Sequence, residues 1–124
     1  MQHQITGLGQ LAITVNDVRL ALPFYTQILG LPFLFAPTEQ LAFVQCGATR
    51  LMLSPPQGTG EVGKNSIPYF QTTAIEEFYA SALEQGALGE RAPQLAAQMP
   101  DHQLWIAFLK DPDGNLIGLM EEKR

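Results

Sequence analysis

The polar residues best suited to chemistry lie in one short segment late in the chain, residues 101–105. His102 is a candidate general acid/base or metal ligand, because imidazole titrates near neutral pH and binds divalent ions. Trp105, three residues later, could stack on a planar ligand. The residues favour the alternative that His102 is a surface histidine where a strand begins. For Trp105 the sequence does not decide between a pocket and the core.

Cys46 and Gln10 are two further candidates. Cys46 would need a nearby base to act as a nucleophile, and neither histidine is close in sequence, so we interpret it as a buried thiol. Gln10 begins an alternating segment, residues 10–16, that is typical of a strand. One face carries Gln10 with the small Ala12 and Thr14. We expect this face to line a cavity, with Gln10 either contacting a ligand or hydrogen-bonded across the sheet.

The composition predicts a single globular domain over residues 1–124. Hydrophobic residues make up 46% of the chain and charged residues 15%, which is typical of a folded protein. A net charge of −5 with scattered basic residues argues against nucleic acid and anionic membranes as partners. No apolar run is long enough for a membrane span and no secretory signal is expected, so we expect a cytoplasmic protein.

The hydrophobic pattern predicts the same order of elements twice, a strand, a helix and three strands. Module 1 covers about residues 8–54, a proline- and glycine-rich linker covers 55–66, and module 2 covers about 67–122. Pro23 lies inside the first helical pattern and predicts an irregular first turn or a kink. The expected helices are 18–29 and 74–85, and the expected strands are 10–16, 31–35, 41–45, 50–54, 67–72, 95–99, 104–110 and 115–120.

Two parts of the chain resemble the glyoxalase/bleomycin-resistance/dioxygenase superfamily, also called vicinal oxygen chelate proteins. The first is residues 10–17, a strand and a helix start, leading into residues 24–32; the second is residues 108–115, which contain an Asp-Pro-Asp-Gly turn. The resemblance implies an α+β fold in which two βαβββ modules form an open eight-stranded, barrel-like sheet around a central cleft.

Many members of that superfamily bind a divalent metal in the cleft, and the resemblance assigns its ligand positions here. Gln10 stands on the first strand, Met52 on the fourth, Ile67 or Pro68 on the fifth, and Gly118 on the eighth, where metal-using members place Glu. Three of these four positions have no suitable donor for a hard ion. We therefore expect no standard metal centre, which argues against glyoxalase I activity.

Other polar residues near these positions remain open to two interpretations. Tyr69 neighbours the fifth-strand position and either donates a hydrogen bond into the cleft or packs. Glu121 is three residues beyond Gly118 and could act as a shifted ligand. Because three is odd, a regular strand turns Glu121 away from the Gly118 side, and a solvated pair with Glu122 is favoured. Lys64, in the linker, is expected to be solvated.

The sequence thus leads to two main functional hypotheses. The first is a metal-free protein, similar to antibiotic-sequestering members, that binds a small aromatic or apolar molecule. The alternative is an enzyme of the isomerase, lyase or dioxygenase type, metal-free or with atypical metal ligands. A cleft filled by its own side chains is a third possibility. No cofactor is expected under the first hypothesis, and a homodimer is expected because members of the superfamily often pair. The ligand-binding candidates are Gln10, Met52, Tyr69, Trp105 and Gly118, and the atypical metal or acid/base candidates are Gln10, His102 and Glu121.

Overall fold

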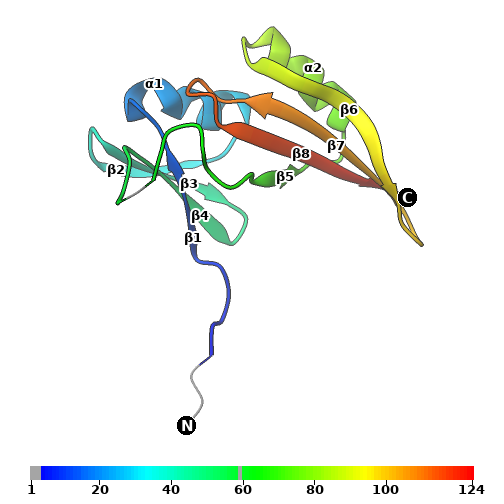
Figure 1. Cartoon of the computed structure of the whole chain (residues 1–124), viewed down its shortest axis with the longest axis horizontal. Helices are drawn as coiled ribbons and strands as arrows, with labels where there is room; N and C mark the ends of the chain where they lie inside the picture. The colour runs from blue at the N-terminus through cyan, green and yellow to red at the C-terminus, as the bar shows by residue number, and fades with distance from the viewer. Residues whose placement is uncertain (1–3, 59) are drawn as a thin grey trace.

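The computed structural model describes residues 4–58 and 60–124, and its strands form two four-stranded sheets (Figure 1). The strand order is β1-β4-β3-β2 in the first sheet and β5-β8-β7-β6 in the second. The first strand of each module is parallel to its neighbour, β1 to β4 and β5 to β8, and the other pairs are antiparallel. The α+β fold with two βαβββ modules is thereby confirmed.

The elements follow the expected order with shifted ends. The first module contains β1 (Gln10–Thr14), α1 (Val18–Pro23), the π-helical turn η1 (Phe24–Ile28), β2 (Phe33–Thr38), β3 (Leu41–Cys46) and β4 (Thr49–Ser54). The second contains β5 (Tyr69–Gln71), α2 (Ile75–Glu84), β6 (Leu88–Gln98), β7 (Gln103–Lys110) and β8 (Leu116–Lys123). Figure 1 shows the modules side by side, with α1 above the first sheet and α2 above the second.

The helical segment changes its hydrogen-bonding pattern at Pro23, as the proline predicts. Asp17 caps the start of α1 by accepting a hydrogen bond from the Arg19 amide at 2.9 Å. The π-helical turn η1 begins immediately after Pro23, and the Leu29 amide bonds to the Phe24 carbonyl five residues back. Pro23 has no amide hydrogen to donate, so the regular ladder is interrupted at that point.

Strand β6 is longer than the expected strand over 95–99. It pairs with β7 through three register shifts, the first between Gly89 and Arg91. Each shift breaks the two-residue alternation by which a strand is found in a sequence. β6 lies at the edge of its sheet, which is where a strand tolerates a residue such as Pro93.

A buried polar network at the β7–β8 turn joins the two modules. Asp111 is 1% exposed, and its carboxylate accepts hydrogen bonds from the Tyr25 hydroxyl at 2.6 Å and the Asn115 side chain at 2.8 Å. It also accepts from the backbone amides of Asp113 and Asn115. Burial, and then the charge of Asp111, raises the pKa of Tyr25 above its ordinary value. Tyr25 therefore remains a hydrogen-bond donor at every physiological pH.

Asn115 extends this network to the first strand and to the segment between the modules. Its Nδ2 donates to the Thr14 carbonyl of β1 at 2.9 Å. Its Oδ1 accepts from the Gly63 amide at 2.9 Å and from the Asn65 side chain at 2.5 Å. One asparagine thus fixes three segments that are far apart in sequence.

No helix within residues 4–58 and 60–124 has the length and apolar character needed to cross a membrane.

Candidate functional site

Each sheet has one face covered by its helix and one face turned away from it. On β4 the alternate residues Leu51 and Leu53 are buried toward α1, whereas Arg50 and Met52 lie on the opposite side. On β8 the same alternation separates buried Leu119 from Met120. We call the two uncovered surfaces the open faces. The first is formed by Gln10, Ala12, Phe35, Phe43, Arg50 and Met52, and the second by Tyr69, Gln71, Ile106, Phe108, Gly118 and Met120.

On the first open face a polar pair lies over an aromatic pair. Arg50 Nε donates to Gln10 Oε1 at 2.9 Å, and the Gln10 Nε2 lies 3.5 Å from the Met52 sulfur. The Arg50 guanidinium carbon is 4.8 Å from the centre of the Phe43 ring, which stacks on Phe35 with a centroid distance of 4.8 Å. Cation–π contact and stacking hold these side chains as one ordered surface.

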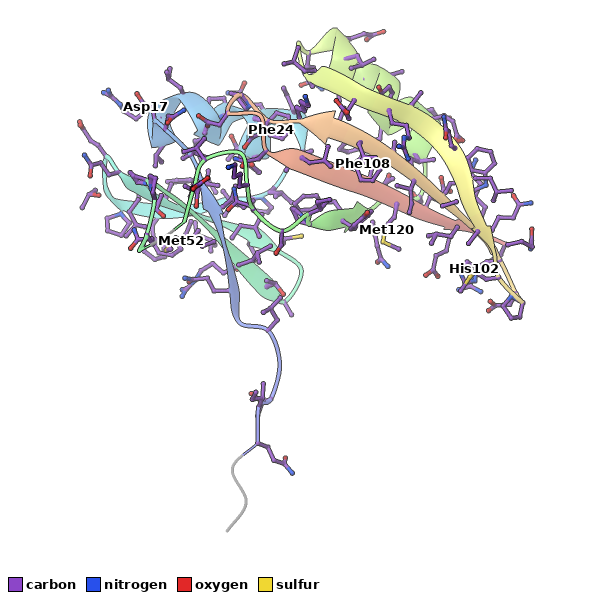
Figure 2. All side chains as sticks on the ribbon, in the orientation of Figure 1. Asp17, Phe24, Met52, His102, Phe108 and Met120 are labelled. Carbon is purple, nitrogen blue, oxygen red and sulfur yellow. The ribbon has the colours of Figure 1, made fainter. Side chains whose placement is uncertain are left out.

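On the second open face an aromatic ring covers a glycine. A Cβ placed on Gly118 would lie 2.6 Å from Cδ2 and 3.0 Å from Cγ of Tyr69. The Tyr69 ring also makes an edge-to-face contact with Phe108, with centroids 5.8 Å apart. Further along this face Gln71, Met120 and Glu122 line a hollow of about 520 Å³ together with Thr72 and Thr73. Figure 2 shows Met120 and Phe108 on the second module and Met52 on the first.

The chain matches one protein family over most of its length. The family described as Glyoxalase/Bleomycin resistance protein/Dioxygenase superfamily matches residues 7–119. The chain belongs to this superfamily. The resemblance seen in the sequence is thereby confirmed.

Proteins similar to this chain have different descriptions. The chain is 26% identical over 121 residues to a probable lactoylglutathione lyase of Vibrio parahaemolyticus, covering 90% of this chain and 88% of the relative. It is 27% identical to a superfamily member of solved structure from Sphaerobacter thermophilus, with a TM-score of 0.75 and coverage of 95% and 98%. The fold is also that of TnmS3, an antibiotic binding protein from Streptomyces sp. CB03234, with 22% identity, a TM-score of 0.79 and coverage of 98% and 100%.

The four metal-ligand positions implied by the superfamily do not fit a hard divalent ion in this member. The Gln10 oxygen already accepts a hydrogen bond from the Arg50 guanidinium, and a metal there would face that positive charge. Met52 offers only a thioether, a soft ligand. Ile67 and Pro68 carry no donor, and Gly118 lies beneath an aromatic ring. Within residues 4–58 and 60–124 no group of three or more His, Cys, Asp or Glu side chains is placed to hold a metal ion.

His102 and Trp105 lie apart from the candidates on the open faces. Figure 2 shows His102 at the tip between β6 and β7, well separated from Met52. Its Nδ1 is 2.7 Å from Asp101, and this hydrogen bond lowers the pKa of that exposed carboxyl. Trp105 packs against the helix-covered core, and the Lys123 ammonium lies 4.4 Å from the centre of its ring.

Glu121 also lies on the helix-covered side, because the alternation along β8 is regular through this residue. Its carboxylate accepts a hydrogen bond from the Ile75 amide at 2.9 Å, in the first turn of α2. The residue before that helix is Ala74, which has no capping side chain. A carboxylate from a neighbouring strand therefore satisfies an amide that a local Ser, Thr, Asp or Asn would satisfy in most helices.

Cys46 is half-buried, and its thiol lines a small apolar pocket of about 110 Å³ that also contains Leu29, Phe70 and Leu119. Burial raises the pKa of the Cys46 thiol. A thiol in such surroundings is a poor nucleophile.

Sequence reasoning missed Arg50, Phe43, Phe35 and Phe108 on the open faces. One signal was present: Arg50 is the only charged residue between Glu39 and Glu61. A single charged residue within three otherwise uncharged strands indicates a side chain that does not belong to the apolar core.

Proposed function

We propose that this protein binds a small aromatic or apolar molecule on its open faces and does so without the divalent metal of its superfamily. The observation that carries this proposal is the Tyr69 ring packed over Gly118. It occupies the space into which a ligand side chain at position 118 would project. The same ring adds an aromatic surface suited to an organic ligand.

The side chains of the open faces support an apolar ligand. The first contributes stacked phenyl rings and a methionine sulfur, and the second contributes Tyr69, Phe108 and Met120. Phe35 is 46% exposed and Tyr69 is 44% exposed, which leaves large rings available for contact. The description of TnmS3 as an antibiotic binding protein agrees with such a role. Of the residues suggested by the sequence, Gln10, Met52, Tyr69 and Gly118 belong to this proposed surface.

We also propose that the protein forms a homodimer in which a second copy covers part of the open faces. Exposed aromatic residues gathered on one surface are typical of an interface or a binding site. Sedimentation at micromolar concentration measures this directly, and a monomer at every concentration would contradict it.

Two measurements on the purified protein test the proposed function. Elemental analysis after dialysis against Ni²⁺, Zn²⁺ or Mn²⁺ should find no stoichiometric ion. Titration with an uncharged fluorescent aromatic such as phenylnaphthylamine should show saturable binding that Tyr69→Ala or Phe35→Ala weakens. A tightly held stoichiometric ion, or turnover of the hemithioacetal substrate of lactoylglutathione lyases, would overturn the proposal.

A further inference from the structure

Two arginines, Arg50 and Arg91, have no carboxylate partner among the residues that the structure describes. The chain has seven Lys and Arg residues against twelve Asp and Glu. Five of the seven lie within 4.0 Å of a carboxylate: Arg19, Lys64, Lys110, Lys123 and Arg124. Within the described residues Arg50 and Arg91 form no such pair. Pairing is the rule on this surface, so these two residues call for another explanation.

Both unpaired arginines lie at exposed positions of the sheets and stack on phenyl rings. Arg50 is over Phe43 at 4.8 Å, and Arg91 is over Phe108 at 5.5 Å. Arg91 is paired in register with Phe108, which places it on the second open face. Among the Lys and Arg residues of the described ranges 4–58 and 60–124, the two without a carboxylate partner therefore lie on the two surfaces that we propose to bind the ligand.

The Arg50 side chain is also held in place before any ligand arrives. Its Nε donates to Gln10 Oε1, and its plane rests on Phe43. No hydrogen bond in the described part of the chain uses its two Nη atoms. A guanidinium fixed in this way loses little side-chain entropy on binding and presents donors in a planar fork that matches an anionic group.

We infer that the ligand is a flat aromatic anion, such as an aromatic carboxylate, sulfonate or phenolate. This inference rests on the proposed function and adds the charge of the ligand to it. The anionic group accepts hydrogen bonds from the Arg50 Nη atoms, which are charge-assisted. The aromatic body of the ligand lies against the exposed ring of Phe35, which stacks on the buried Phe43. Gln10, a metal-ligand position in the superfamily, here orients the arginine.

A matched pair of fluorescent probes tests the inference. Anilinonaphthalene sulfonate is an aromatic anion with a flat naphthalene ring, and phenylnaphthylamine is the same scaffold without the sulfonate. Arg50→Gln should weaken binding of the sulfonate about tenfold, the lower end for a hydrogen bond to a charged group. It should change the affinity for the uncharged probe by less than about twofold, because the aromatic contacts remain. Arg19→Gln, which removes a paired arginine on α1, is the control and should change neither affinity.

The outcomes separate this inference from the proposed function. If both probes bind and Arg50→Gln weakens them equally or not at all, the inference is wrong and the proposed function stands. If neither probe binds the wild-type protein, both fail. If Arg50→Gln dissociates a dimer and leaves sulfonate binding unchanged, the arginine pairs with a carboxylate of a second copy and the inference is wrong. Should Arg50→Gln fail to fold, Gln10→Ala gives the same comparison, because it removes the hydrogen bond that orients Arg50, and it should weaken binding of the sulfonate more than that of the uncharged probe.

Discussion

Replacing Tyr25 with phenylalanine removes a single hydroxyl from the network that joins the modules. Tyr25 is fully buried and Asp111 is 1% exposed, so water cannot replace the lost donor. The carboxylate keeps three of its four hydrogen bonds, those from the Asn115 side chain and from two backbone amides. A hydrogen bond to a charged group contributes about 1.5–3 kcal/mol. We expect Tyr25→Phe to lower the free energy of unfolding by that amount.

For a chain of this length the expected fall in Tm is about 3–5 °C for each kcal/mol, or about 5–15 °C in total. Urea denaturation followed by circular dichroism measures the free energy, and an unchanged m-value shows that the unfolded state is the same. Tyr79→Phe is the matched control, because the Tyr79 hydroxyl makes no hydrogen bond in the described part of the chain. A loss below about 0.5 kcal/mol for Tyr25→Phe, or an equal loss for both variants, would refute the reasoning.

Three further predictions concern side chains near the open faces and the helix ends. Gly118→Ala should lower the free energy of unfolding by about 1–3 kcal/mol, because the new methyl group meets Tyr69. In the Tyr69→Ala background this loss should be smaller, and urea denaturation that finds the two losses additive would contradict the prediction. Glu121→Ala should lower the free energy of unfolding by about 0.5–2 kcal/mol and speed amide hydrogen exchange in the first turn of α2. Unchanged exchange would argue against a capping role for the Glu121 carboxylate. The pKa of the Asp101 carboxyl should lie below its ordinary value when measured by NMR, because the hydrogen bond with His102 lowers it, and His102→Ala should raise that pKa. Because the folded pKa is the lower one, the stabilisation is present above the unfolded pKa and is lost as the pH falls through the folded value.

The parts of the fold that depend on local chemistry could be predicted from the sequence. Gly30 and Gly86 have positive φ values of 75° and 98° where the helical segments end, as helix C-termini require. The turn after Asp111 contains Gly114 with a φ of 83°. The break at Pro23 follows from a missing amide hydrogen. Each of these signals involves residues within a few positions of one another.

The orientation of side chains on β7 could not be predicted in the same way. Its two alternating sets, one with Trp105 and Leu109 and the other with Ile106 and Phe108, are both apolar. The two-residue alternation of a strand therefore assigns the two sets to opposite faces, but it does not predict which face α2 covers. The partners of Arg50 were hidden for a related reason. Whether an arginine has a carboxylate partner or stacks on a ring depends on residues of neighbouring strands, and the spacing of residues along one strand does not predict those neighbours.

The contact between Tyr69 and Gly118 has a consequence for the mutational paths open to this chain. A carboxylate introduced at position 118 would meet the ring and lower the free energy of unfolding, while removing the ring alone leaves a glycine, which has no ligand atom. Neither change alone both frees the space at position 118 and supplies a ligand atom there, whereas the two changes together do both. The two positions are therefore epistatic: the effect of a carboxylate at position 118 on stability depends on whether residue 69 carries the ring.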